Sequence, residues 1–163
     1  ATTGNISDSG NLTIAGTSSF TTSANNGTIT LNNTNAFAGA VTITTNDDSG
    51  TDADVTIDNG TTALILAAST IDGDLTLTSG NNITDNGTVT VGGNLLAVTD
   101  DNSGVINLDS LAVDAGIHLR THGTGDATAV NDAGFGFGIG GSTVGGNLIA
   151  TATTGNMWDY GCG

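Results

Sequence analysis

The sequence contains no proline, lysine, glutamate or glutamine, and its single arginine is Arg120. Long unbranched side chains are among the strongest helix formers, so their scarcity argues against a helical protein. The 163 residues are instead rich in Thr, Val, Ile, Asn, Asp and Gly. These residue types build strands and tight turns. The composition therefore predicts an all-β protein with little or no helix.

Positive charge is almost missing as well. All 16 acidic residues are aspartates, and the formal net charge is −15. This charge opposes binding to DNA, RNA or anionic lipid. No apolar run approaches the roughly 20 residues of a membrane helix, and no signal peptide is recognisable. We therefore expect no nucleic acid partner, no membrane insertion, and a mature or excised segment that is secreted or exposed at the cell surface.

The sequence repeats itself over a long distance. The pattern of residues 6–16 returns at residues 83–93, and a third landmark follows at residues 157–161. The pentapeptide Ala-Thr-Thr-Gly-Asn precedes both the first and the third landmark. Repetition at a fixed offset, here about 75 residues, is typical of elongated scaffolds.

This repetition predicts one domain over residues 1–163. It would consist of two long repeats, residues 6–82 and 83–156, followed by a C-terminal tail, residues 157–163. Because the chain starts and ends in the same repeat phase, copies could stack head to tail with little adjustment. Such a contact does not close on itself and generates filaments.

Short alternating segments separated by Gly, Asn and Asp turns predict many strands of four to six residues. They fit a right-handed parallel β-helix of about six to seven coils, with an antiparallel β-sandwich as the alternative. Alternation predicts that aliphatic pairs such as Leu75 and Leu77 point inward while the threonine between them points outward. The predicted coils start near Ile6, Thr28, Asp54, Ile83, Val105 and Thr128.

One motif points to a known family. The stretch Ile-Thr-Asp-x-Gly-x-Val-Thr-Val-Gly-Gly-Asn, beginning at Ile83, resembles the repeats of filamentous-haemagglutinin-like adhesins. These are large secreted exoproteins of Gram-negative bacteria, many exported by two-partner secretion. The resemblance covers roughly residues 1–156. It implies a right-handed parallel β-helix on a bacterial surface, and it brings no catalytic residues.

The tail collects rare residue types. Met157, Trp158, Tyr160 and Cys162 are the only Met, Trp, Tyr and Cys of the chain. One cysteine cannot form an internal disulfide, so any disulfide would join another chain. An open solenoid end exposes backbone as an edge strand does, so these residues are a candidate self-assembly contact. A cap within the same chain is the alternative.

The only cationic residues lie close together. His118, Arg120 and His122 alternate, which would place them on one face of a strand. This stripe could meet an acidic patch of a neighbouring subunit or an anionic glycan, or simply pair with nearby aspartates. The two histidines would be about 13 Å apart, too far to share a metal ion.

Aspartates cluster near one corner. Asp47, Asp48, Asp52 and Asp54 could hold Ca²⁺, since extracellular rods use such oxygen-rich corners. No recognised calcium-loop pattern is present, and turn formation explains most of these residues. We expect no cofactor other than this possible calcium.

These observations favour a structural role. The chain lacks Glu, Lys and any recognisable catalytic arrangement, so we do not expect an enzyme. The favoured function is a self-assembling subunit of an extracellular filament, sheath or adhesin rod, with itself as the main partner. Two alternatives remain: a fragment of a large adhesin that binds a glycan or host receptor elsewhere, and an ice-binding β-solenoid suggested by Thr-x-Thr pairs.

Overall fold

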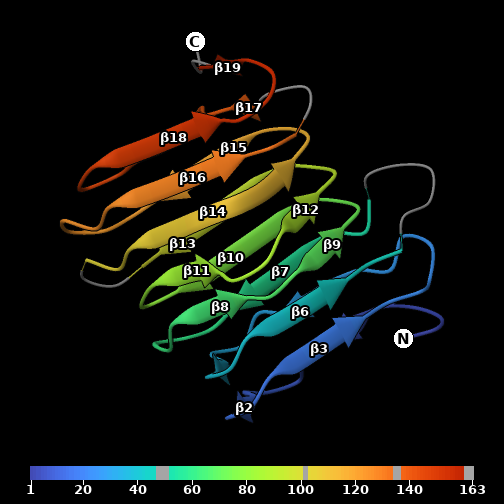
Figure 1. The fold of residues 1–163 in the computed structure, drawn as a ribbon. Coiled ribbons are helices and arrows are strands. Elements are labelled where there is room, and N and C mark those ends of the chain that lie inside the picture. The colour runs from blue at the N-terminus through green and yellow to red at the C-terminus, as the bar shows by residue number, and fades with distance from the viewer. Residues whose placement is uncertain (47–51, 101–102, 134–136, 160–163) are drawn as a thin grey trace.

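The structure is a computed structural model that describes residues 1–46, 52–100, 103–133 and 137–159. Every regular element in these ranges is a β-strand, and none is a helix. The chain climbs from its blue N-terminal end to its red C-terminal end as a stack of coils (Figure 1). The all-β prediction is confirmed. No helix long and apolar enough to cross a bilayer occurs in these ranges.

The first sheet takes one strand from each of six successive coils. In spatial order it contains β1 (Ile6–Ser7), β4 (Ile29–Leu31), β7 (Val55–Asp58), β10 (Leu75–Ser79), β13 (Leu95–Thr99) and β15 (Ile117–Arg120).

The second sheet has nine strands and forms the opposite wall, seen at the front of Figure 1. The strand β14 is long because it passes a corner of the coil, and it pairs with both β11 and β12. The strands of this sheet are β3 (Ser18–Thr21), β6 (Val41–Thr44), β8 (Leu64–Leu66), β9 (Ser69–Ile71), β11 (Ile83–Asp85), β12 (Val89–Val91), β14 (Ile106–Val113), β16 (Ala127–Asn131) and β18 (Leu148–Ala152).

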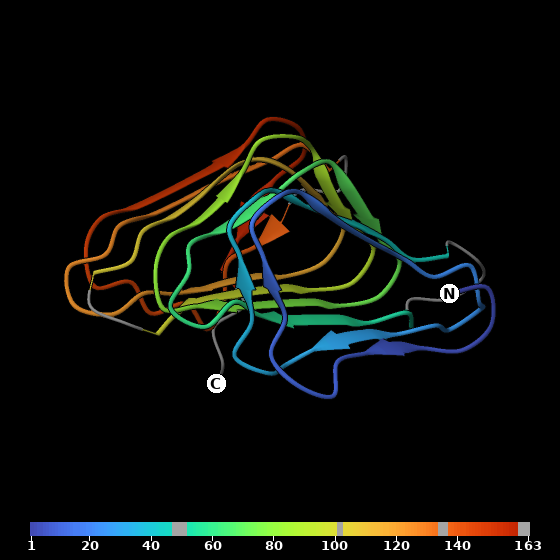
Figure 2. The ribbon, with the colours of Figure 1, turned by 90° about the horizontal axis from the view of Figure 1, so that it is seen from below.

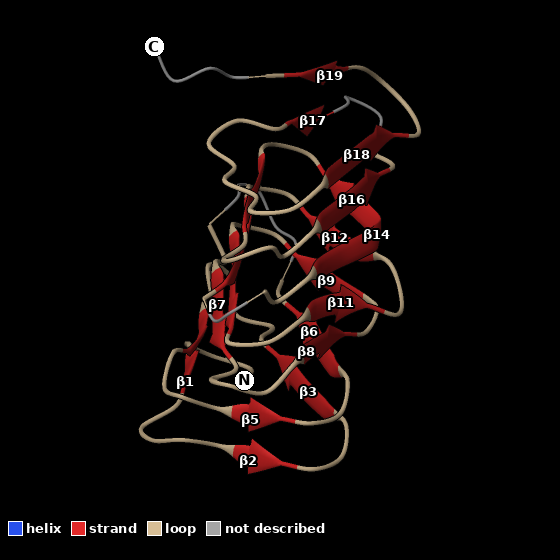
Figure 3. Ribbon diagram, turned by 90° about the vertical axis from the view of Figure 1, so that its left-hand side faces the viewer, coloured by secondary structure: helices blue, strands red, loops and turns tan. Residues whose placement is uncertain are grey.

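A short pair of parallel strands lies at each end of the column. At the N-terminal end β2 (Thr13–Ile14) pairs with β5 (Ala36–Phe37). At the C-terminal end β17 (Phe137–Gly138) pairs with β19 (Met157–Trp158). Figure 3 shows these pairs at opposite ends of the column. A bridge between Gly116 and Gly138 places β17 above the residues that lead into β15 (Ile117–Arg120).

All strand pairings within the described residues are parallel, so the molecule is a parallel β-solenoid. This excludes the antiparallel sandwich. Viewed from the N-terminal end, the chain runs clockwise as it recedes (Figure 2), so the coils are right-handed, as expected.

The positions of the coils differ partly from the prediction. The register of the first sheet places the coil starts at Ile6, Ile29, Val55, Leu75, Leu95 and Ile117. The first three agree with the expected starts. The expected starts at Ile83, Val105 and Thr128 are wrong, because these residues lie on or beside strands of the second sheet. The similar landmarks at Ile6 and Ile83 therefore lie on different faces, and their separation is not a whole number of coils.

The core is a stack of aliphatic columns. Inward residues at matched positions lie directly above one another, such as Val55, Leu75 and Leu95, which are at most 1% exposed. Outward neighbours such as Thr56 and Thr76 are half-buried. The predicted alternation is confirmed for the pairs Ile29 and Leu31, Val41 and Ile43, Val55 and Ile57, Leu75 and Leu77, and Val89 and Val91. Leu12 and Ile14, in the first coil, are only partly buried against this core.

Candidate functional site

At the corner where the chain enters the first sheet, side-chain oxygens accept hydrogen bonds from backbone N–H groups of the next coil. Oδ1 of Asp54 accepts a hydrogen bond from the backbone N–H of Asp74 at 2.8 Å, and Oδ1 of Asp74 accepts one from Asn94 at 2.6 Å. Oδ1 of Asn94 in turn accepts one from the N–H of Gly116 at 3.0 Å. Each acceptor serves the residue one coil further along, so the three bonds form a continuous ladder. Backbone donors at a corner have no strand partner, and this ladder satisfies them.

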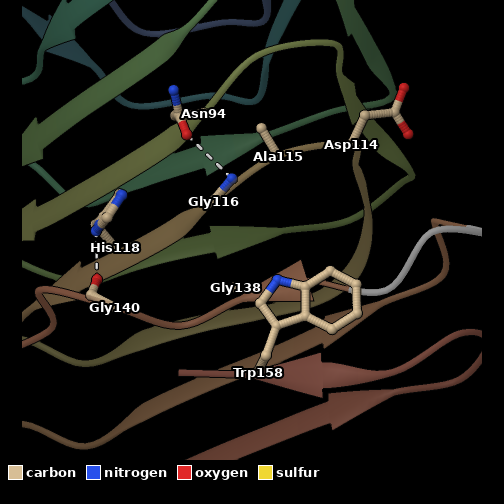
Figure 4. A pocket seen from close by; sticks show the side chains of 8 residues that line it. All are labelled: Asn94, Asp114, Ala115, Gly116, His118, Gly138, Gly140 and Trp158. Atoms are coloured by element: carbon tan, nitrogen blue, oxygen red, sulfur yellow. Dashed lines mark hydrogen bonds between the residues drawn. The ribbon is translucent and has the colours of Figure 1, made fainter. Parts of the chain in front are cut away.

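The ladder of side chains stops at Gly116. The register places Asn94, Gly116, Gly138 and Trp158 at the same position of four successive coils. The two glycines contribute no side chain, so a hollow remains between Asn94 and Trp158. Its volume is about 390 Å³. Figure 4 shows it, with a lining that includes Asn94, Asp114, Gly116, His118, Gly138 and Trp158.

The imidazole of His118 has a fixed orientation in this hollow. Its Nδ1 lies against the carbonyl oxygen of Gly140 (Figure 4). A carbonyl oxygen only accepts hydrogen bonds, so Nδ1 carries the proton and Nε2 of the neutral ring is an acceptor. A Cβ added at Gly116 would lie 3.1 Å from this Nε2 and 3.0 Å from Oδ1 of Asn94. Two acceptors therefore converge above the bare backbone of Gly116.

The predicted cationic stripe is divided between two hollows. His118 and Arg120 belong to β15, and His122 follows it. His118 lines the hollow beside Trp158, whereas Arg120 and His122 are exposed and line a second hollow together with Asp100. The structure thus brings Arg120 and His122 together and separates both from the surroundings of His118. What this stripe binds stays a prediction.

The predicted self-assembly residues fall at the C-terminal end of the column. Met157 is 41% exposed and Trp158 is 38% exposed. Trp158 belongs to the outward column of Asn94 and lies beside the hollow, whereas Met157 precedes it in β19. Tyr160 and Cys162 lie outside the described residues. Self-assembly through these four residues stays a prediction.

The same end exposes an inward column. Leu148 lies directly above Ala127, which lies above Ile106, Ile83 and Leu64 in turn. The lower four residues are at most 1% exposed, but Leu148 is 44% exposed. Ile149, its outward neighbour, is 56% exposed. No local sequence pattern distinguishes Leu148 from a buried inward residue, because its exposure depends on its place in the stack.

Part of the predicted calcium corner is described. Oδ1 of Asp54 accepts a hydrogen bond in the corner ladder. The side-chain amide nitrogen of Asn26, in the amide orientation that satisfies both side chains, donates to Oδ1 of Asp52 at 2.8 Å and to its Oδ2 at 3.1 Å. Asp47 and Asp48 lie outside the described residues. Within residues 1–46, 52–100, 103–133 and 137–159, no three His, Cys, Asp or Glu side chains are grouped to hold a metal ion.

The surroundings of Asp8 and Asp85 shift the ionisation of their carboxyl groups. Burial opposes ionisation of Asp8, but hydrogen bonds from the side chains of Asn35 and Asn33 and from nearby backbone outweigh it. The pKa of Asp8 is therefore below its ordinary value of 3.8. At Asp85 burial dominates and raises the pKa above 3.8, although its carboxylate accepts hydrogen bonds from the backbone of Ser110 and Asp109.

Buried asparagines were missed by the sequence analysis. Asn59 is fully buried, and its Oδ1 accepts from the N–H of Phe37 at 2.7 Å while its Nδ2 donates to the carbonyl of Ala63 at 2.9 Å. Asn131 bonds the backbone of Val113 in the same two ways. An Asn-Gly pair such as Asn59-Gly60 predicts a turn, and Gly60 does have a positive φ of 53°. Nothing in such a pair distinguishes an inward from an outward asparagine.

Threonines form a column on the second sheet. The register places Thr21, Thr44, Thr70 and Thr90 at one outward position of four successive coils. The varying coil length conceals this alignment in the sequence.

Comparison with known proteins gives one family. A family model described as repeats of unknown function (DUF5649) matches residues 1–44 and 52–120. The comparisons with curated proteins and with solved structures gave no match. A link to filamentous-haemagglutinin-like adhesins is not shown by these comparisons, although a repeat protein with a β-solenoid fold agrees with what that resemblance implied.

Proposed function

The chain belongs to the family of repeats of unknown function (DUF5649), and from this premise we propose that it is a structural rod of a bacterial extracellular filament, sheath or adhesin. In this proposal the protein is secreted or displayed at the cell surface, is not an enzyme, and has further copies of itself as partners. A repeat solenoid with a hydrated acidic surface is compatible with such a role.

The observation that carries the proposal is the open column at Leu148. An apolar inward side chain that is 44% exposed lies above four buried residues of the same column. At the other end Ile6, Leu12, Ile14 and Phe20 are only partly buried. Stacking one copy on the next would bury both sets and pair the uncovered strands. The contact joins unlike surfaces, so it propagates as a filament.

Sedimentation velocity and negative-stain microscopy of the purified chain test this. We expect fibres with a regular repeat, and we expect Leu148→Asp to abolish them because it places a charge inside the joint. Ile149→Asp is the matched control, since it adds the same charge one residue away on the outer wall. Monodisperse short rods from the unaltered chain would reject self-assembly and favour a segment of a larger adhesin.

A second candidate function is ice binding, favoured by the column Thr21, Thr44, Thr70 and Thr90. Parallel coils space such threonines at about 4.8 Å along the rod. A thermal-hysteresis assay tests it. Activity that disappears in Thr70→Tyr but persists in Thr76→Tyr, on the other sheet, would support ice binding. Freezing behaviour equal to that of buffer would exclude ice binding.

A further inference from the structure

We propose that the hollow between Asn94 and Trp158 binds an uncharged saccharide, with one sugar ring placed against the indole of Trp158. The proposal does not require filament formation, because all the residues that line the hollow belong to a single chain.

The size of the hollow comes from the interrupted corner ladder. Gly116 and Gly138 remove two consecutive side chains from a column that carries Asp or Asn in the three coils before Gly116. The resulting 390 Å³ lies in the range of small-molecule sites, which is about 300–1,000 Å³. A ligand can approach the backbone closely there, because nothing projects from either glycine.

The polar groups at one end suit a hydroxyl. Oδ1 of Asn94 and Nε2 of His118 converge above Gly116, and both accept hydrogen bonds. A sugar hydroxyl can donate to either of them and still accept a bond itself. The orientation of His118 is held by Gly140 and that of Asn94 by Gly116. The two acceptors are therefore in place before a ligand arrives, which reduces the entropy lost on binding.

The other end suits the apolar face of a sugar ring. Trp158 is 38% exposed, and its indole lies beside Gly138 in Figure 4. The negative face of an aromatic ring attracts the weakly positive C–H groups that line one face of a pyranose. Tryptophan offers the largest such face, and it is present only once in the chain.

Charge decides between classes of ligand. The net charge of −15 and the exposed carboxylate of Asp114 at the rim repel phosphate, sulfate and carboxylate groups. An organic ammonium ion is the competing class, since it would also favour an aromatic face and acceptors. In Figure 4, however, the carboxylate of Asp114 is turned away from His118 and Asn94. The acceptors that converge in the hollow are therefore an amide oxygen and an imidazole nitrogen and not a carboxylate, which favours hydroxyl groups.

The single tryptophan provides a direct readout. The probes are the methyl glycosides of glucose, galactose, mannose and N-acetylglucosamine, together with maltose and cellobiose. We expect at least one of them to change the emission of Trp158 saturably. Because Trp158→Ala removes the reporter, saturation-transfer NMR of the same probe follows binding in variants.

Variants then separate the site from nonspecific contact. We expect Trp158→Ala and Gly116→Val to weaken binding about tenfold or more. The first removes the aromatic face, and the second places a side chain against the two acceptors, Oδ1 of Asn94 and Nε2 of His118. Met157→Ala, its neighbour in β19, is the matched control and should leave affinity unchanged. Circular dichroism confirms that each variant keeps its strand content.

Three outcomes would overturn the proposal. The first is the absence of a saturable response to any probe at or below about 20 mM, which corresponds to about 2 kcal/mol of binding. The second is equal binding by Gly116→Val and the unaltered chain, and the third is binding of tetramethylammonium in place of the saccharides. The last result would identify a cation site.

Discussion

Oδ1 of Asp74 accepts a hydrogen bond from the backbone N–H of Asn94 at 2.6 Å, one coil further along the rod. Asn94 repeats the arrangement toward Gly116, and Asp54 makes the same contact with Asp74. The aspartates and asparagines of this corner therefore join coils to one another. Their abundance in the sequence has a structural reason that involves no ion.

Asp74→Ala tests this joining role. The change removes the acceptor for both the backbone N–H and the side-chain amide of Asn94. We expect the free energy of unfolding to fall by about 1 kcal/mol, the usual contribution of an exposed hydrogen bond. Urea denaturation measures it. Asp114→Ala removes the same charge from another exposed corner and should change stability by less than about 0.5 kcal/mol. Equal effects of the two changes would contradict the ladder.

Asn59→Ala should be considerably more damaging. It would leave the backbone N–H of Phe37 and the carbonyl of Ala63 without the amide of Asn59. The carbonyl of Thr62 would lose one of its two donors and keep the hydroxyl of Ser79. We expect a loss of about 3 kcal/mol, since each unsatisfied buried group costs about 1–3 kcal/mol. Thermal unfolding measures it, with the exposed Asn81→Ala as the control. A loss no larger than that of the control would mean that water replaces the amide.

The pH dependence at Asp8 has a definite sign. Its folded-state pKa is below 3.8, so its contribution to stability is fully present above 3.8 and is lost as the pH falls through the folded pKa. We therefore expect the stability difference between the unaltered chain and Asp8→Asn to shrink as the pH is lowered below 3.8. Urea denaturation from pH 5 to pH 2 measures it. A difference that stays constant over this range would contradict the shift.

Asp85 should show the opposite sign. Burial raises its folded-state pKa above 3.8, so its contribution is fully present below 3.8 and is lost as the pH rises through the folded pKa. Relative to Asp85→Asn, the unaltered chain should lose stability as the pH rises from 3.8 through that value. Carbon-detected NMR of the carboxyl groups gives an independent check, in which Asp85 titrates at higher pH than Asp8. The reverse order would refute at least one of the two assignments.

Strand alternation was readable from the sequence because it depends only on neighbouring residues. Leu75, Thr76 and Leu77 point inward, outward and inward as expected. The register of the coils could not be predicted from the sequence, because the strands of every wall of the rod share the same alternating pattern. Ile6 and Ile83 begin similar motifs but lie on different sheets. The reason is that the corners differ in length, so that a whole coil contains between 20 and 26 residues.

The hollow beside Trp158 could not be predicted for the same reason. It depends on Asn94, Gly116, Gly138 and Trp158 lying above one another, at separations of 22, 22 and 20 residues. No motif connects these residues in the sequence. The sequence analysis noticed Trp158 and His118 separately, but only the stacking of the coils brings them to one place.

The core columns become smaller toward the C-terminal end, where Ala127, Ala129 and Ala133 occupy inward positions that Leu and Ile fill in earlier coils. Each coil contacts only its neighbours, so stability is distributed locally along the rod. The coil that carries Ala127 and Ala129 therefore buries less hydrocarbon than the coils lined by Leu and Ile. It should open locally more readily than those coils, so resistance to opening varies along the rod.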